Sequence, residues 1–430
     1  MSFFTPVLHF LRQTRILSRV NAWVEYYDLP DLALLALLSA FPFFQLLEHS
    51  TLWLLPMCLL LLLWFLKRLV WGREVKLDFA DFLVLLTLLL QISVAFTGYG
   101  RIEDALTAAL LTSVWFSARQ YFRERGEAAL AFLSSLALLA VSTIGVGQYL
   151  FGMAEVRWVD AARFGDIGGR VTSLFSNPNI LAVYLLLYFP FPLWGSFLPQ
   201  NAVRLRIFYA ITATLAAACI LLTWSRGAWL GLLLECFLFL LLHSRKSRLV
   251  LAFSPLALLA FPLLPSNFKG RFSSIVDLGE SSVRYRLHTW QGTCTMLAHH
   301  PVGIGVGEWA WRIIYPPHAV SGTRTVMHAH NVFLQLATEL GIVGLAVFLL
   351  LVFLSLRRAA SGKSFAVLSA ASGVLVMGMF DHLWYYPGML VPFWSMLAFC
   401  SSNRQKEPQI TALWIFCTKT NAIIYKKTTK

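Results

Sequence analysis

The chain has 430 residues, of which 58% are hydrophobic and only 13% charged, and its formal net charge is +14 at pH 7. Soluble domains carry about 25% charged residues, so this chain has too little polar surface for a water-soluble globule and needs membrane lipids around it. Its basic residues are dispersed between apolar stretches, as membrane topology requires, so we expect no nucleic-acid partner.

Residues 1–264 are predicted to form an N-terminal transmembrane bundle of about nine spans, since about 20 apolar residues are needed to cross a bilayer. The beginning of the chain is basic but lacks the apolar core and cleavage site of a signal peptide, so the first span is expected to be a signal anchor. The connection 151–178 is long and is expected outside. The spans expected here are 31–47, 51–66, 79–97, 105–119, 128–150, 179–198, 205–223, 227–243 and 249–264.

A long, less apolar segment, 265–330, follows and contains Gly/Pro-rich and amphipathic stretches. The C-terminal transmembrane helices are expected within 331–402, as spans 331–356, 364–381 and 385–401, and a basic tail follows at 403–430. The predicted fold class is therefore an all-α integral membrane protein with about twelve transmembrane helices. Its one long periplasmic loop should carry short amphipathic helices.

The positive-inside rule orients the predicted bundle. With both termini in the cytoplasm, most Lys and Arg residues fall inside, including those near Lys67, Arg245 and Arg358. The segment 265–330 then lies outside, at the periplasmic face of an inner membrane. Because insertions of this length between tightly spaced spans are usually functional, we expect the chemistry there. No internal repeat indicates an inverted-repeat transporter.

Arg226 lies between two apolar spans with almost no loop, flanked by Trp224 and Trp229. A cation at such depth is costly unless it is paired or faces a wet cavity, so a functional role is favoured. The alternative is that Arg226 extends to the membrane interface. The other outer basic residues are almost all arginine, whose planar fork matches phosphate oxygens, which indicates a bound phosphate or carboxylate.

His330 immediately precedes Asn331 and an apolar span, so it should lie at the outer mouth of a membrane helix. The partial positive charge of a helix N-terminus favours neutral imidazole, which can accept a proton from a hydroxyl. The alternative is that His330 or Asn331 only caps the helix. His328 and His330 have the wrong spacing for a zinc site on one helical face, and the six cysteines show no metal or redox spacing, so we expect no metal, no cofactor and no disulfide.

Residues 281–291 are predicted to begin an amphipathic helix, with Arg286 and Trp290 on one face and Arg284 and His288 on another. The Gly-rich stretch 303–307 is not a dinucleotide fingerprint, because no strand precedes it. It is expected to turn the chain along the membrane surface. Asp381, at the last outer turn, is expected either to orient the site or to anchor the interface with the aromatic residues that follow.

Taken together, these motifs resemble the O-antigen ligase and polymerase superfamily of bacterial envelope glycosyltransferases. The resemblance is carried, in the family's order, by residues 175–179, 223–230, 286–290, 300–307 and 330–345. Members of this family move a glycan from undecaprenyl pyrophosphate onto an acceptor hydroxyl at the outer membrane face, without a metal. The tail after Ser402 matches nothing in the family's pattern.

The resemblance implies an undecaprenyl-pyrophosphate-linked glycan as donor and lipid A-core, another glycan or a protein as acceptor. It places the family's catalytic residues on His330, Arg226 and Arg286, with Arg284 as a substitute for Arg286 and His328 for His330. The substrate-binding residues that we expect are Arg284, Arg170, Asn177, Asn179, Trp290, His328 and Asp381. Two rival functions stay open, a polymerase of the same superfamily and a membrane transporter of the bicarbonate-transporter type.

Overall fold

The computed structural model describes residues 29–44, 54–71, 77–97, 99–156, 169–253, 265–274, 277, 279–382 and 387–402. In these ranges the regular elements are helices, and one isolated bridge pairs Glu155 with Arg170. The first half contains α3 (Leu29–Phe44), α4 (Leu54–Trp71), α5 (Phe79–Ser93), η3 (Val94–Thr97), α6 (Ile102–Thr112), α7 (Val114–Arg125), α8 (Ala128–Leu150), α10 (Pro178–Tyr188), α11 (Pro190–Phe197), α12 (Val203–Leu222) and α13 (Arg226–His243).

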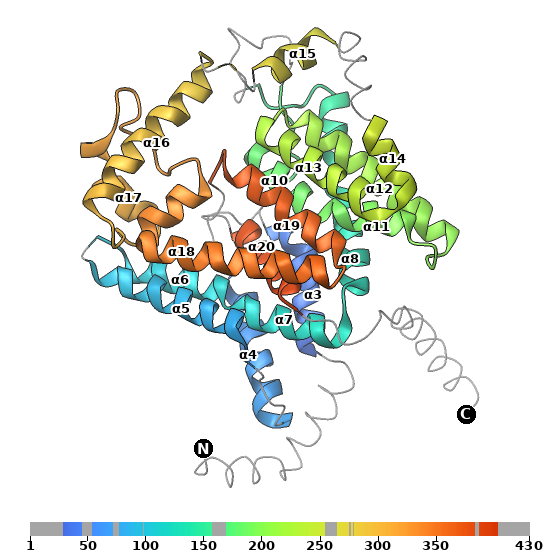
Figure 1. Cartoon of the computed structure of the whole chain (residues 1–430), viewed down its shortest axis with the longest axis horizontal. Helices are drawn as coiled ribbons and strands as arrows, with labels where there is room; N and C mark the ends of the chain where they lie inside the picture. Colours follow the sequence, from blue (N-terminus) through green and yellow to red (C-terminus); the bar gives the residue numbers. More distant parts are fainter. Residues whose placement is uncertain are drawn as a thin grey trace.

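The second half begins with α14 (Arg245–Phe253), and the helices of the predicted outer loop follow. These are α15 (Ser266–Ser273), α16 (Ser281–His299), α17 (Glu308–Ile314) and η7 (Pro316–His318). The chain closes with α18 (Val332–Ser361), α19 (Phe365–Gly378) and α20 (Pro387–Cys400). In Figure 1, α16 and α17 lie together at one edge of the molecule, close to the helices of the bundle.

Six helical segments are long and apolar enough to cross a membrane: 79–97, 128–150, 178–197, 203–222, 226–243 and 332–361. Two shorter apolar helices lie at 365–378 and 389–400. The prediction of an all-helical membrane protein is therefore confirmed, whereas the number of twelve spans stays a prediction. The expected span 105–119 is divided between α6 and α7 at Ser113, and most of the expected span 249–264 lies outside the described residues.

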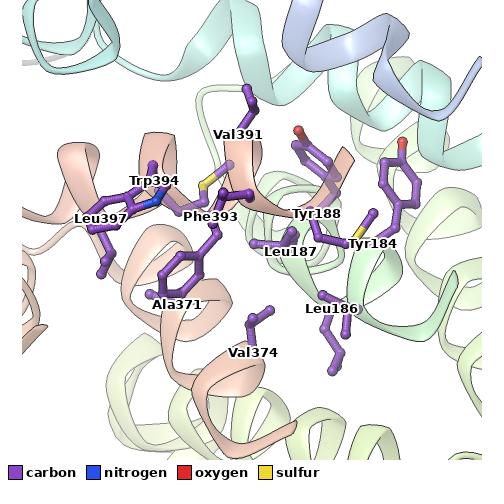
Figure 2. Close-up of a cluster of buried hydrophobic side chains, with 14 of the residues drawn as sticks. Tyr184, Leu186, Leu187, Tyr188, Ala371, Val374, Val391, Phe393, Trp394 and Leu397 are labelled. Atoms are coloured by element: carbon purple, nitrogen blue, oxygen red, sulfur yellow. The ribbon is translucent and has the colours of Figure 1, made fainter. Parts of the chain in front are cut away.

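The segment 178–197, formed by α10 and α11, is the centre of the bundle. Of its apolar window 83% is buried, whereas the other five candidate spans reach at most 50%. A helix that is apolar on every side needs neighbours on every side. Figure 1 shows α10, α19 and α20 in the middle of the molecule, and Figure 2 shows Leu187 and Tyr188 of α10 beside Val374 of α19 and Phe393 of α20.

The Gly-rich stretch 303–307 fills a break in α18, which the sequence pattern did not predict. Gly341 has φ +73° inside this helix, so the helical hydrogen bonds are interrupted there. The chain before α17 supplies replacements, because Ile304 N donates to Thr338 O at 2.8 Å and Ile342 N donates to Pro301 O at 3.0 Å. A Cβ on Gly303 would lie 2.6 Å from the carbonyl oxygen of Glu339, so only glycine permits this approach. The loop thereby fixes the first turns of α18.

The two ends of the bundle carry different polar groups. At one end, α10, α13 and α18 begin while α12 and α19 end, so the connections between them meet there. At the other end Asp78 accepts hydrogen bonds from Arg119 and from Arg358 of the last turn of α18. Burial alone would raise the pKa of Asp78, but these two arginines lower it to about 2. This ion cluster ties the start of α5 to the ends of α18 and α20.

Candidate functional site

His330 lies before α18 in the left-handed region, with φ +48°, a conformation that is uncommon outside glycine and that histidine, asparagine and aspartate adopt more readily than other residues. The helix is capped by its neighbour, since Asn331 Oδ1 accepts hydrogen bonds from Phe333 N at 2.9 Å and Leu334 N at 3.0 Å. The capping role expected for either residue therefore belongs to Asn331. The imidazole of His330 is turned instead toward the end of α19.

The Nδ1 atom of His330 lies 3.1 Å from Oδ1 of Asp381. The Asp381 side chain is 10% exposed and that of His330 is 25% exposed, so the acid is covered and the base is accessible. Burial alone would raise the pKa of Asp381, but the hydrogen bond with His330 and the nearby charges of His330 and Arg286 hold it well below its usual range. An ionised Asp381 accepts a hydrogen bond from the Nδ1–H group of His330. The lone pair of the neutral imidazole is then on Nε2.

Asp381 is connected through Asn179 to Arg170. Asn179 Nδ2 donates to Asp381 Oδ2 at 2.7 Å, and Asn179 Oδ1 accepts from Arg170 Nη2 at 2.7 Å. Asn177 has a different place, because its Oδ1 caps α10 by accepting from Asn179 N at 2.8 Å. Arg170 and Asn179 are thus brought to the site directly, whereas Asn177 contributes through the start of α10. Burial, and next the charges of Arg271 and Arg286, lower the pKa of Arg170 to about 9.

The tight connection between α12 and α13 is held by arginines on two sides. Trp224 is buried and has φ +52°, so the backbone turns through a left-handed residue. Arg170 Nε donates to Thr223 O at 2.6 Å, and Arg271 Nε and Nη2 donate to Trp224 O, both at 3.1 Å. These bonds satisfy carbonyls that the helix end leaves open. They fix the position of Arg226, the first residue of α13.

The side chain of Arg226 is 9% exposed and does not extend to a surface. Its Nη1 donates to Ser274 O at 2.8 Å and to Ser274 Oγ at 3.2 Å. Its Nη2 donates to Glu280 Oε2 at 2.8 Å and also to Ser282 Oγ. Glu280 is a residue that the sequence reasoning missed, and its place directly before Ser281 in a capping position was the one signal that could have found it.

Arg286 projects toward the same group of charges from α16. Its Nε is buried and has no hydrogen-bond partner among the described residues. Burial lowers the pKa of Arg286, the charge of Arg226 lowers it further, and Asp381 and Glu280 oppose this. Arg284 is exposed and donates to Gly279 O at 3.2 Å. Of the two alternatives on this helix, Arg286 is the arginine close to Asp381.

Trp290 follows Arg286 by one turn of α16, as the predicted amphipathic pattern requires. Its indole nitrogen is buried and has no hydrogen-bond partner in the described part of the chain. An indole N–H in this condition has an unused donor.

The histidines of the loop fall into two groups. The ring of His328 meets that of His330 edge-on, with ring centroids 4.2 Å apart, and lies tilted against that of His382 at 5.2 Å. Burial, and next the charge of His330, lower the pKa of His328 to about 4, so this imidazole is neutral at pH 7. His318 lies elsewhere, with its ring 5.0 Å from His299. Of the loop histidines, the structure thus places His328 and His330 near Asp381, and it adds His382.

Ligand atoms of His328, His330 and Asp381 lie within 4.8 Å of one another, which is the donor set of many zinc sites. The surroundings do not suit a cation, because both carboxylate oxygens already accept hydrogen bonds, from His330 and the His382 backbone on Oδ1 and from Asn179 on Oδ2. The positive charge of Arg286 is close as well. These observations favour a hydrogen-bonded relay over a metal site.

Two parts of the chain considered in the sequence analysis lie outside the described residues, namely 157–168 of the expected outer connection 151–178 and the aromatic residues 384–386 after Asp381. Five of the described candidates share one location. Arg170, Asn179, Asp381 and His330 form a continuous hydrogen-bonded chain, and Arg286 faces it.

Residues 211–349 of the chain match a family model described as O-antigen ligase. The match covers Arg226, Arg286 and His330 and ends before Asp381. The comparison with curated proteins found no match.

Proposed function

We propose that the chain is a member of the O-antigen ligase family, whose model its residues 211–349 match, and that it transfers a glycan from undecaprenyl pyrophosphate to an acceptor hydroxyl. The membrane helices agree with a donor whose lipid tail stays in the bilayer. The acceptor that we propose is lipid A-core or a similar glycan or protein. The reaction takes place at the outer face of the inner membrane, where the positive-inside rule puts the loop 265–330.

The observation that carries the proposal is the pairing of His330 with Asp381. An ionised carboxylate on Nδ1 fixes the imidazole in the tautomer whose Nε2 accepts a proton. In the proposed reaction the acceptor hydroxyl gives its proton to His330 Nε2, and the hydroxyl oxygen forms a bond to the anomeric carbon of the glycan. The bond from this carbon to the pyrophosphate oxygen breaks, and undecaprenyl pyrophosphate leaves with the electron pair.

Arg286 is proposed to stabilise the negative charge that develops on the departing pyrophosphate. A donor aimed at developing charge in a water-poor site contributes more to catalysis than the same donor in water. Arg286 suits this role because its Nε is buried without a partner among the described residues and because it stands close to Asp381 and His330. Arg170 and Asn179 keep Asp381 in place, and Trp290 is proposed to contact the donor with its indole N–H.

No step of this proposal needs a metal, because the base is an imidazole and the leaving group is stabilised by the guanidinium of Arg286. The proposed division of the chain is 1–264 as the N-terminal bundle, 265–330 as the outer loop, 331–402 as the closing helices and 403–430 as the tail. The site takes Arg170 and Asn179 from the first part, Arg286 from the second and Asp381 from the third. The catalytic centre is thus an assembly of three segments.

A polymerase of the same superfamily is the second candidate, because it uses the same donor and the same family match applies to it. The transporter alternative finds no support in this match. Glycolipid profiles of cells with and without the gene test the proposal. Loss of polymer from lipid A-core, with accumulation of free lipid-linked polymer, supports a ligase. Products with a single repeat indicate a polymerase, and an unchanged profile contradicts both.

A further inference from the structure

The guanidinium of Arg226 fastens the connection between α15 and α16 to the start of α13. Both terminal nitrogens of Arg226 are engaged, Nη1 by Ser274 and Nη2 by Glu280 and Ser282. A pyrophosphate that bound these nitrogens would first have to displace the carboxylate of Glu280. Both terminal nitrogens of Arg226 are therefore already bonded inside the protein.

Glu280 also caps α16, and this second role would be lost if its carboxylate were displaced from Arg226. Its Oε2 accepts from Val283 N at 2.9 Å and from Ser282 Oγ at 2.7 Å, so the same oxygen caps α16. The side chain of Glu280 is 2% exposed and that of Arg226 is 9% exposed. Removing one partner from a buried ion pair leaves an uncompensated charge and is strongly destabilising. The pair is thus a clamp on the first turn of α16.

The first two turns of α16 carry the groups that the reaction needs. Arg286 lies in these turns, with a buried Nε that has no partner in the described part of the chain. Tyr285 lies beside it, with its ring centroid 5.9 Å from that of His330. A change in how α16 begins would therefore move Arg286 relative to His330.

We infer that Arg226 is a positioning residue, which acts through Glu280 to hold Arg286 in place and does not itself bind the donor. The inference rests on the proposed function for the identity of the reaction, while the clamp itself is a property of the fold. Within this account, Arg286 is the guanidinium that binds the pyrophosphate, and Arg226 sets its location.

A double-mutant cycle with Arg226→Ala, Glu280→Ala and the combined variant tests the inference. Each single variant should lower the initial rate of glycan transfer on the order of tenfold to a hundredfold, and the combined variant should be no slower than the worse single variant, because coupled partners are not additive. Hydrogen exchange of amides 281–287 should be faster in all three proteins. Variants of the exposed Arg312–Glu308 pair, which is 2.9 Å apart on α17, are the matched control. They should change neither the rate of glycan transfer nor the hydrogen exchange of amides 281–287.

The milder variant Glu280→Gln guards against loss of the fold, because its amide oxygen still accepts from Val283 and Ser282. It should lower kcat with little change in the KM for the donor. An active Glu280→Ala protein with an unchanged or lower donor KM, beside an inactive Arg226→Ala protein, would overturn the inference, since Arg226 would then bind the donor when freed. If no protein, wild type included, transfers glycan while exchange at 281–287 still responds to the clamp, the proposed function fails and the clamp stands.

Discussion

The Nδ1 atom of His330 lies 3.1 Å from Oδ1 of Asp381, and this contact joins the N-terminal end of α18 to the C-terminal end of α19. Neither residue belongs to a helix, and each is fixed by its neighbours. Asn331 caps α18 and also donates to Met379 O at 3.0 Å, which holds the two helix ends together. The pair is therefore built into the end of the bundle.

Asp381→Asn should lower the rate of glycan transfer on the order of 10²-fold or more, because an amide in place of the carboxylate favours the wrong tautomer of His330. Initial rates at equal membrane levels measure this. Asp381→Glu should keep more activity, since the charge is retained. Equal rates for Asp381→Asn and wild type would show that the acid only packs the end of α19.

Asn179→Ala should also slow transfer, by a smaller factor, because it removes the bond that links Asp381 Oδ2 to Arg170. The matched control is Asn201→Ala, which removes a hydrogen bond of similar length, 2.8 Å to Gly195 O, in the connection between α11 and α12. Asn201→Ala should transfer glycan at a rate close to that of the wild type. If both variants are equally impaired, the effect of Asn179 is one of general stability.

Arg286→Ala should lose most of its activity, since the guanidinium that stabilises the leaving pyrophosphate is gone. Arg286→Lys should keep only part of the wild-type activity, because a point charge replaces a planar fork of hydrogen-bond donors. Arg284→Ala is the control on the same helix, because its side chain is exposed and bonds to Gly279 O. Steady-state rates against donor concentration compare the three. Loss of activity in Arg284→Ala, with normal activity in Arg286→Ala, would show that Arg284 is the arginine that stabilises the pyrophosphate.

The stability of the protein should fall as the pH is lowered from about 6.5 to about 4. Burial, and next the charge of His330, lower the pKa of His328 to about 4, whereas an unfolded histidine titrates at about 6.5. Between these values the unfolded state binds more protons, so acid favours unfolding. The apparent melting temperature in detergent, measured against pH, should fall less steeply for His328→Gln. His299→Gln, at an exposed position, should follow the wild type.

The loop 265–330 should be accessible from the periplasm, and the connections near Lys67, Arg245 and Arg358 from the cytoplasm. Single cysteines introduced at His318 and at Arg245, in a protein without its own cysteines, can be labelled with an impermeant reagent in whole cells and in inverted vesicles. Cysteine at 318 should react in whole cells only. Reaction in inverted vesicles only would contradict the orientation on which the outer-face chemistry depends.

Much of the fold could be predicted because hydrophobic length determines membrane helices, and the expected spans fall on observed helices such as α8, α12 and α13. The division of 105–119 into α6 and α7 could not be predicted, because apolar residues lie on both sides of Ser113, with Leu111 before it and Val114 after it. The kink at Gly341 likewise depends on hydrogen bonds from the distant residues Pro301 and Ile304.

In the site, the cap formed by Asn331 is local, and Asn331 was one of the two capping residues that the sequence offered. The convergence of Arg170, Asn179 and Asp381 depends on how the helix ends meet in space. The sequence marked these residues individually, through arginine, asparagine and histidine at predicted helix ends. Glu280 was missed because its importance comes from Arg226, which lies 54 residues earlier in the chain. Partners this far apart are chosen by the packing of the bundle and leave no local pattern.

The most direct test of the account is the initial rate of glycan transfer in vitro, against pH, for wild type, His330→Asn and the control His328→Ala. Asparagine tolerates the left-handed backbone of His330, so the variant keeps the fold while it cannot accept a proton. We expect a rate about 10²–10⁴-fold lower for His330→Asn, activity in wild type that falls as the pH drops, and a His328→Ala enzyme that still transfers glycan. A fully active His330→Asn protein would contradict the assignment of His330 as the base.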